Sequence, residues 1–290
     1  MNYKLKDAIY GFAVGDAMGV PFEFLKRGTF ECNNMTKAKF PNPRCILPEG
    51  TWSDDTSLML CVLDALNYSS DKKEIYRKYR SNCIKWLSYG AFSCGRFDVG
   101  VSTFKGILSM MLRIPNRSAR NYHSNGNGGL MKILPVAFID IDTDIDILEY
   151  IKLFNSCSHA HDLSNEACLF YIKLLKNLLS DNTDLHVALY NSCTDKTFTS
   201  GWLSHTLASP VQNIKSSGFV VDTLSSVVYC LNNTNNYKDA VLTAVNLGHD
   251  TDTIAALVGG VAGVYYGYDE IPDNWVKKLR KIKVFENYLS

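Results

Sequence analysis

Asp250-Thr251-Asp252-Thr253-Ile254-Ala255-Ala256-Leu257-Val258-Gly259-Gly260-Val261-Ala262-Gly263 is the stretch of this 290-residue chain that says most about its fold. Two carboxylates open the stretch, and an uncharged run of small and apolar residues follows. A run that is apolar on every face is typical of a buried helix. Its glycines would let a second helix approach closely. The stretch therefore predicts a central helix with Asp250 and Asp252 in its first turn.

A second acidic cluster, Ser53-Asp54-Asp55-Thr56, precedes another apolar run, Leu58 to Leu66. Ser53 is a typical N-cap residue, and negative charge is favoured at a helix N-terminus. Capping alone explains either cluster taken singly. If the two helix starts met, however, four carboxylates would be crowded together, and a pair of divalent cations such as Mg²⁺ or Mn²⁺ would neutralise them.

Helical periodicity dominates the rest of the chain. Apolar residues recur at helical spacing in 147–154, 167–178 and 220–231. Pro272-Asp273 predicts the start of a last helix that carries Trp275, Leu279 and Ile282. No linker or low-complexity segment divides the chain, so we predict one all-α domain over residues 1–290.

Composition narrows the function classes. The chain has 30 Lys+Arg against 29 Asp+Glu, and this balance gives no indication of a nucleic-acid partner. Its nine cysteines are odd in number and contain no C-x-x-C pair, and the N-terminus has no signal-peptide pattern. We therefore expect reduced thiols in a cytoplasmic protein. The apolar stretch Ile254 to Tyr268 is too short to span a membrane and is better explained as a buried helix.

Four further segments carry polar groups in positions of interest. Asp16 lies among glycines and apolar residues, where it either caps a neighbouring helix or takes part in catalysis. The Gly-rich segment Ser124 to Met131 has amides that would suit a phosphate. Ser158 to Asp162 contains two histidines and a carboxylate. Asp98 lies before a turn at Gly100, and the sequence leaves open whether its role is structural or functional.

Taken together and in this order, these segments resemble the ADP-ribosylglycohydrolase family, which includes the dinitrogenase reductase-activating glycohydrolase and hydrolases acting on modified arginine or serine. The resemblance runs from Ala8 to about Leu279. The matching segments are Gly15-Asp16 with Glu23, Trp52 to Ser57, Phe97 to Gly100, Gly126 to Met131, Ser158 to His161, Gly218 to Leu224, and Asn246 to Thr253.

The resemblance implies an orthogonal helical bundle with a binuclear Mg²⁺ or Mn²⁺ centre. It also implies a hydrolase, acting as a monomer, that releases ADP-ribose from a protein side chain such as arginine or serine, or from a small molecule. By position it implies Ser53, Asp54 and Asp55 as ligands of one ion, Asp250 and Thr253 as ligands of the other, and Asp252 as the bridge between them. It implies catalytic roles for Glu23, Asp55 and Asp98. The residues that it implies at the substrate are Asp16, Ser124, Asn125, Gly126, Asn127, Gly128, Gly129, Met131 and His159.

The chain departs from the family's pattern in places. Asn125 stands where some relatives have an aromatic residue at the adenine end, and Tyr122 would be the alternative stacking face. His249 replaces a frequent glycine, and Lys132 a frequent arginine.

Two other functions remain open from the sequence. A His-Asp metallophosphohydrolase would use His159, His161 and Asp162 with Asp250 or Asp252. A non-catalytic relative would bind ADP-ribose or serve structurally.

Overall fold

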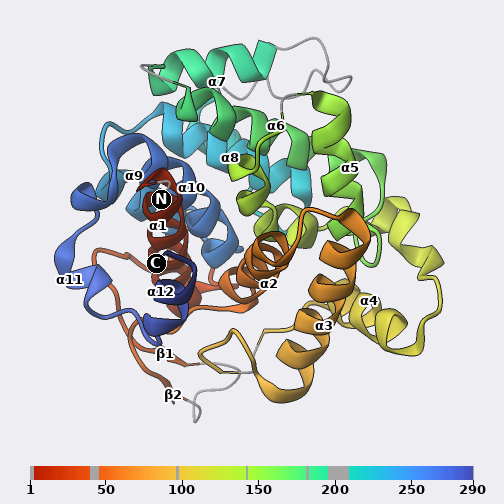
Figure 1. Ribbon diagram of the computed structural model, residues 1–290. Coiled ribbons are helices and arrows are strands. Elements are labelled where there is room, and N and C mark those ends of the chain that lie inside the picture. The colour runs from red at the N-terminus through yellow and green to blue at the C-terminus, as the bar shows by residue number, and fades with distance from the viewer. Residues whose placement is uncertain are drawn as a thin grey trace.

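The computed structural model describes residues 3–39, 46–95, 98–141, 143–180, 183–194 and 209–289, and Figure 1 shows their arrangement. The α-helices are α1 (Tyr3–Gly19), α2 (Asp54–Tyr68), α3 (Lys72–Tyr89), α4 (Val101–Leu112), α5 (Asp144–Asn155), α6 (Asp162–Leu179), α7 (Leu185–Thr194), α8 (Val220–Asn232), α9 (Tyr237–Asn246), α10 (Thr251–Tyr266), α11 (Asp273–Val276) and α12 (Lys283–Leu289). Short 3-10 turns are η1 (Val20–Phe22), η2 (Arg117–Arg120), η3 (Tyr122–Ser124), η4 (Asn127–Lys132), η5 (Leu134–Phe138), η7 (Val211–Asn213) and η8 (Tyr268–Glu270). The strands in this part of the chain, β1 (Ala38–Lys39) and β2 (Ile46–Leu47), pair antiparallel. The all-α prediction is confirmed.

Helices α1 and α10 form the centre of the fold and lie side by side in antiparallel order (Figure 1). Their contact is made by backbone, because a Cβ at three glycines of α1 would overlap the main chain of α10. The facing pairs are Gly11 with Gly259, Gly15 with Ala255, and Gly19 with Asp252. The prediction that α10 permits close helix packing is confirmed, and the pairing brings the start of α10 to the end of α1.

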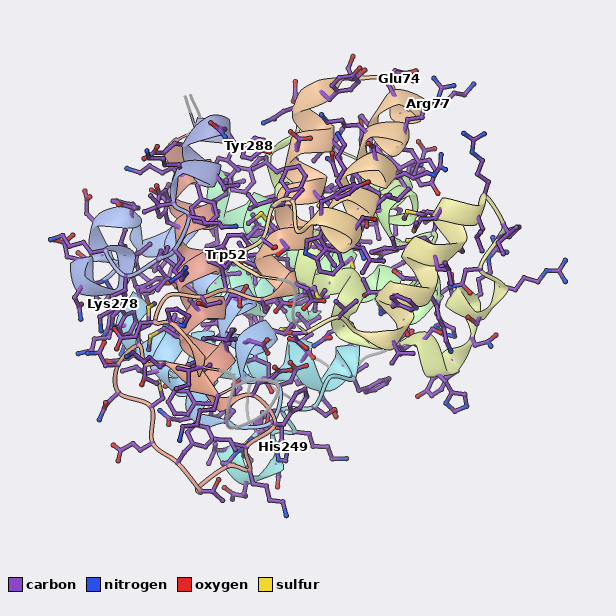
Figure 2. The ribbon with its side chains drawn as sticks, turned by 90° about the horizontal axis from the view of Figure 1, so that it is seen from below. Trp52, Glu74, Arg77, His249, Lys278 and Tyr288 are labelled. Carbon is purple, nitrogen blue, oxygen red and sulfur yellow. The ribbon has the colours of Figure 1, made fainter. Side chains whose placement is uncertain are left out.

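Helix α2 is buried over nearly its whole length, as predicted, with Asp54 to Leu63 inaccessible or nearly so. The Ser53 hydroxyl accepts a hydrogen bond from the Asp55 amide at 3.2 Å and so caps the helix. Trp52, just before the cap, is wholly buried, and its Nε1 donates to the Arg280 carbonyl at 3.1 Å. Figure 2 shows Trp52 inside the molecule, whereas Glu74 and Arg77 lie at its surface. The start of α2 is thus held in place from two sides.

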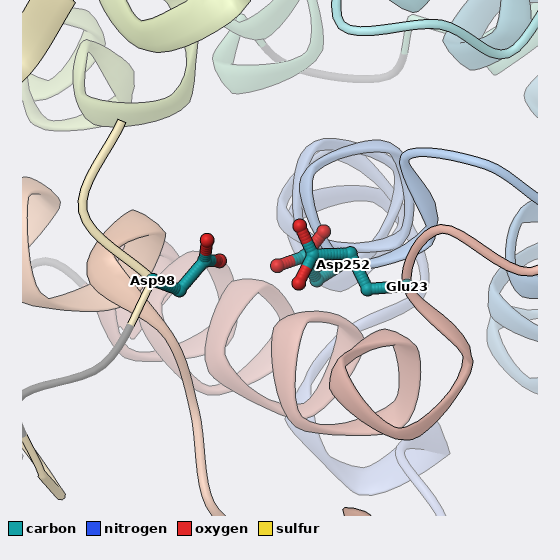
Figure 3. A group of neighbouring side chains, drawn as sticks. All are labelled: Glu23, Asp98 and Asp252. Atoms are coloured by element: carbon teal, nitrogen blue, oxygen red, sulfur yellow. The ribbon is translucent and has the colours of Figure 1, made fainter. Parts of the chain in front are cut away.

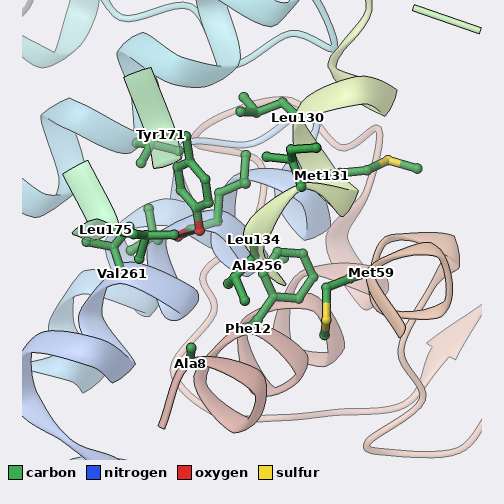
Figure 4. Close-up of a cluster of buried hydrophobic side chains, with 14 of the residues drawn as sticks. Ala8, Phe12, Met59, Leu130, Met131, Leu134, Tyr171, Leu175, Ala256 and Val261 are labelled. Carbon is green, nitrogen blue, oxygen red and sulfur yellow. Dashed lines mark hydrogen bonds between the residues drawn. The ribbon is translucent and has the colours of Figure 1, made fainter. Parts of the chain in front are cut away.

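The hydrophobic core is one continuous cluster around α10. Gly260 packs against Leu134, Tyr171 and Phe12, and a Cβ there would meet all three side chains. The Tyr171 hydroxyl donates to the Leu257 carbonyl at 3.0 Å, which satisfies its buried polar group. Figure 4 shows the surrounding side chains, contributed by α1, α2, α6, α10 and the 3-10 turns η4 and η5.

The prediction of one last helix is wrong. Helix α11 ends at Val276, and α12 begins only at Lys283. Lys281 between them has a φ of 50°, in the left-handed region that interrupts a helix. The Arg280 amide donates to the Gly50 carbonyl at 3.0 Å instead of to a helical partner. Leu279 and Ile282 therefore lie in the connection. Among the described residues, no helix is long and apolar enough to cross a membrane.

Candidate active site

A cavity of about 490 Å³ opens where the end of α1 and the starts of α2, α4 and α10 meet. Six carboxylates line it, contributed by Glu23, Asp54, Asp55, Asp98, Asp250 and Asp252. The other lining residues are Phe24, Gly100, Val101, Ser102, Thr103, Gly126, Asn127, Gly128, Met131, His159, Ser217, Gly218, His249 and Thr253. No lysine or arginine of the described part is among them. The cavity is strongly anionic.

Three of the carboxylates converge at one point. Oxygen atoms of Glu23, Asp98 and Asp252 all lie within 4.8 Å of one another. Figure 3 shows the three side chains directed toward a common centre from three separate segments. The antiparallel pairing of α1 and α10 brings Asp252 close to Glu23. The sequence did not reveal this register, although it singled out all three residues.

Helix α2 adds Asp54 and Asp55, and Asp16 fixes its start. Asp16 is fully buried behind the cavity wall and accepts hydrogen bonds from the Ser53 amide at 2.9 Å and from the Thr56 amide at 3.1 Å. It also accepts one from the Thr56 hydroxyl at 2.5 Å. The expectation that Asp16 contacts substrate is therefore corrected, since its carboxylate holds the first turn of α2. Ser53 likewise lies outside the cavity lining.

Burial raises the pKa of every carboxylate in the cavity, and for all but Asp250 the neighbouring carboxylates raise it further. Burial, and then the charge of Asp98, raises the pKa of Glu23 to about 10. Burial, and then Asp250, raises the pKa of Asp98 to about 6. Burial is also the main cause for Asp55 and Asp252, whose pKa values rise well above the usual range. Charged carboxylates packed in this way repel one another unless a cation lies between them.

The donor set fits a hard divalent cation. Within the described residues, the buried oxygens Glu23 Oε2 and Asp55 Oδ2 have no hydrogen-bond partner. An unpaired buried carboxylate oxygen is costly, and a metal ion is one of the few partners that would satisfy it. Carboxylate and hydroxyl oxygens without sulfur or imidazole are the ligands that Mg²⁺ and Mn²⁺ prefer.

The Gly-rich segment forms another wall of the cavity. The side-chain nitrogen Nδ2 of Asn127 donates to Asp250 Oδ2 at 2.6 Å and to the Thr223 hydroxyl at 3.0 Å. These bonds connect the Gly-rich segment to the start of α10. Gly126, Gly128 and Met131 line the cavity as expected.

Three residues of the segment that were expected at the substrate do not line it. Asn125 is buried between Tyr122 and Ser164, a Cβ at Gly129 would meet Asn155, and the Ser124 hydroxyl donates to the Ser118 carbonyl. Their expected substrate contacts are corrected accordingly.

Two buried nitrogen-bearing side chains, Lys132 and His159, lie next to Gly128 in this wall. Lys132 is 1% exposed and donates to the Gly128 carbonyl at 2.6 Å, and burial lowers its pKa. His159 lines the cavity beside Gly128, and its Nδ1 lies 2.9 Å from the Ser158 hydroxyl. Burial, and then Lys132, lowers the pKa of His159 to about 3, so the ring is neutral at physiological pH. A neutral imidazole can offer one hydrogen-bond donor or acceptor to a bound molecule.

The geometry contradicts the metallophosphohydrolase hypothesis. His161 Nδ1 accepts a hydrogen bond from the Leu163 amide at 3.2 Å and caps α6. With Asp162 it lines a separate cavity, next to Arg120 and Lys152, and neither residue reaches the acidic one. Of the three proposed partners only His159 lies there, so the histidine ligands that such an enzyme needs are not assembled.

The sequence missed the rim of the cavity. Phe24 has a φ of 64° and is 69% exposed, and its amide donates to the His249 carbonyl at 2.7 Å. His249 has a φ of 62°, and its amide donates to the Leu25 carbonyl at 2.7 Å. Val101, which also lines the cavity, is 70% exposed. The sequence offered one signal for these rim residues: Phe24 directly follows Glu23, and Val101 directly follows the turn that contains Asp98. Phe97, part of the matched segment, lies outside the described residues.

Comparisons with known proteins show the family to which the chain belongs. The family model described as ADP-ribosylglycohydrolase matches residues 2–290. An ADP-ribosylarginine hydrolase of Pseudomonas putida is 32% identical over 292 residues, which cover 95% of this chain and 74% of the relative. The ADP-ribosyl-[dinitrogen reductase] glycohydrolase of Rhodospirillum rubrum is 26% identical, with coverages of 94% and 88%.

A solved structure gives the same result. The chain titled "ADP-ribosylglycohydrolase-related protein complex" superposes with a TM-score of 0.79 at 25% identity, and the match covers 99% of this chain and 95% of that one. The likeness extends over the complete fold, and the acidic clusters fall within the matched length. The chain therefore belongs to the ADP-ribosylglycohydrolase family of glycosidic-bond hydrolases.

Proposed function

We propose that the protein, acting as one domain, hydrolyses the bond between ADP-ribose and an arginine side chain of a protein, using two Mg²⁺ or Mn²⁺ ions. The observation that carries this proposal is that six carboxylates line a cavity without a lysine or arginine in its described lining. An arginine-linked ADP-ribosyl group places a guanidinium at the scissile bond, and an anionic cavity favours a cationic acceptor over a neutral one. The name of the Pseudomonas relative supports the same acceptor.

The residues that would hold the ions are those that the family resemblance implies. Asp54 and Asp55, with Ser53 at the edge, would bind one ion. Asp250 and Thr253 would bind the other, and Asp252 would bridge the two. Bound ions would supply Lewis acidity toward a water molecule and the ribose hydroxyls.

The chain's own groups would position the substrate. Gly126, Gly128 and Asn127 line the wall that would take the diphosphate, where main-chain amides and the absence of side chains suit a close approach. His159 beside them would add one neutral hydrogen bond. Asp98, in the converging group with Glu23 and Asp252, would stabilise the positive charge that develops on the ribose as its bond to nitrogen lengthens.

The reaction adds water across the carbon–nitrogen bond. The water oxygen bonds to the ribose carbon, the bond to the guanidine breaks, and one water proton ends on the departing nitrogen. Glu23 Oε2, which has no other described partner, would accept this proton from the attacking water and pass it on. Without a cation, burial and the neighbouring carboxylates raise the pKa of Glu23 to about 10 and keep it protonated. A cation bound beside it would offset this rise and leave the carboxylate charged, as a general base requires.

The direct test offers matched peptides that carry ADP-ribose on arginine or on serine, with Mg²⁺ or Mn²⁺ and with EDTA as control. We expect release of ADP-ribose from the arginine-linked peptide to be at least about tenfold faster, because only this acceptor is cationic. EDTA should abolish release. Faster cleavage of the serine-linked peptide would contradict the acceptor, and full activity after thorough metal removal would contradict the metal centre.

A further inference from the structure

Helix α4 presents an apolar face to solvent. Val101, Phe104, Leu108, Met111 and Leu112 are 40% to 70% exposed, and the first four follow one another at helical spacing. We call these five residues the α4 face. With Ile114, they make up six of the sixteen exposed large hydrophobic side chains in the described part of the chain, all within fourteen consecutive positions. Such clustering marks an interaction site rather than ordinary scatter.

The buried side of α4 is the less apolar one. It consists of Thr103, Gly106, Ile107, Ser109 and Met110. A Cβ at Gly106 would meet the Cys157 carbonyl and the Ser158 side chain, so the helix packs there through a residue without a side chain. A helix that only packs on its own domain turns its larger apolar residues inward. Helix α4 lies beside α3 at the margin of the molecule (Figure 1). It turns most of its larger apolar residues outward.

The α4 face is continuous with the active-site cavity. Val101 lines the cavity and is also the first residue of the face. Phe24 lines the same cavity and is equally exposed, so the entrance carries exposed apolar side chains although the interior is acidic. Whatever covers the α4 face therefore also lies against the entrance.

We propose that the α4 face binds the polypeptide that carries the ADP-ribosyl group, so that the substrate is a folded protein rather than a modified amino acid. This rests on the function proposed above. A helix of 12 residues is about 18 Å long, which is much more than a single modified arginine spans. A second copy of this chain held there permanently would obstruct the entrance, whereas an acceptor protein arrives with its ADP-ribose and leaves after hydrolysis.

The charged residues around the α4 face indicate which kind of partner surface would bind it. The exposed charged residues on and next to the face, Lys105, Arg113 and Arg117, are all basic. An acceptor surface that combines apolar and acidic groups would complement them. The cavity interior is acidic and takes the cationic guanidinium, so the cavity and the α4 face select for opposite charges on the same partner.

The test compares two substrates for the same enzyme. One is a mixture of proteins ADP-ribosylated on arginine by a transferase, and the other is free ADP-ribosylarginine, with Mn²⁺ present in both assays. We expect the wild-type enzyme to prefer the modified proteins. The double variant Leu108→Ser/Met111→Ser should lose at least about tenfold in kcat/KM on proteins, equivalent to about 1.4 kcal/mol, and should stay within about twofold on the small substrate.

The chain offers a matched control on α7. Val187 and Tyr190 are 52% and 60% exposed and are three positions apart, as Leu108 and Met111 are. The double variant Val187→Ser/Tyr190→Ser should leave kcat/KM unchanged on both substrates. The single variant Phe104→Ser should reproduce the selective loss if the double variant folds poorly.

Four results would overturn the proposal: no preference of the wild type for proteins, equal losses on both substrates, no loss on either, or a wild-type dimer by light scattering that the α4 variant dissociates. Wild-type inactivity on both substrates would instead refute the proposed function, on which the docking surface depends.

Discussion

Replacing Asp252 with asparagine is expected to lower kcat/KM by at least about 10³-fold, a loss of about 4 kcal/mol in transition-state stabilisation. Asp252 is 2% exposed and lies in the converging group with Glu23 and Asp98. It is the one residue proposed to contact both ions. The substitution keeps the size of the side chain and the hydrogen bond that Oδ1 accepts from the Thr253 amide at 2.9 Å. Steady-state kinetics with an arginine-linked substrate measures the effect.

The same variant should be more stable than the wild type without metal. Burial raises the pKa of Asp252, and the charges of Glu23 and Asp55 raise it further, so its charged form destabilises the folded state above the ordinary carboxylate pKa. Asparagine removes this charge. We expect a higher Tm in EDTA at neutral pH, by about 2–4 °C for each kcal/mol of repulsion relieved. Saturating Mn²⁺ should reverse the order, because only the wild type gains the full binding energy.

Asp162 provides the control. It lies in the first turn of α6 and lines the separate cavity next to His161. Asp162→Asn should leave the kinetics unchanged. Equal losses in the Asp162 and Asp252 variants would mean that the acidic cavity is not the reaction centre, and they would restore the His-Asp hypothesis.

Replacing Gly15 with valine should destabilise the fold by about 3 kcal/mol or more. A Cβ at Gly15 would overlap the Ala255 carbonyl, which is rigid backbone within α10, so the two central helices would have to separate. The intrinsic helix propensity of valine exceeds that of glycine, and the loss must therefore come from packing. Denaturant unfolding measures it, and activity should fall with stability because the α1–α10 contact sets the approach of Glu23 to Asp252.

The control variant is Lys85→Val, on the exposed side of α3, which introduces the same β-branched side chain without a packing conflict. It should change the free energy of unfolding by less than about 0.5 kcal/mol. If Gly15→Val unfolds at the same denaturant concentration as the wild type, the close packing of α1 on α10 is not what holds the two acidic ends together.

Local patterns in the sequence predicted much of this structure. The Ser53 cap, the buried α2 and the glycine-rich α10 follow from rules that act within one helix, and so they could be anticipated. The family resemblance placed the acidic residues, and the structure brings Glu23, Asp98 and Asp252 together.

What escaped prediction depends on distant contacts. The sequence left open whether Asp16 caps or catalyses, and only the position of α2 against α1 shows its carboxylate accepting hydrogen bonds from Ser53 and Thr56. Asn125 sits in a loop that could be accessible or buried, and its contact with Ser164 on α6 decides the matter. The interruption at Lys281 arises because Arg280 bonds to Gly50, far away in the sequence.

The central claim is that the acidic cavity holds two divalent cations, and counting them tests it most directly. After equilibrium dialysis against Mn²⁺, metal analysis of the wild-type protein should give about two ions per chain, with fewer than one in Asp252→Asn, because the variant lacks the shared ligand. A wild-type protein that binds no Mn²⁺ at millimolar concentration, or a variant that binds as many ions as the wild type, would contradict the account.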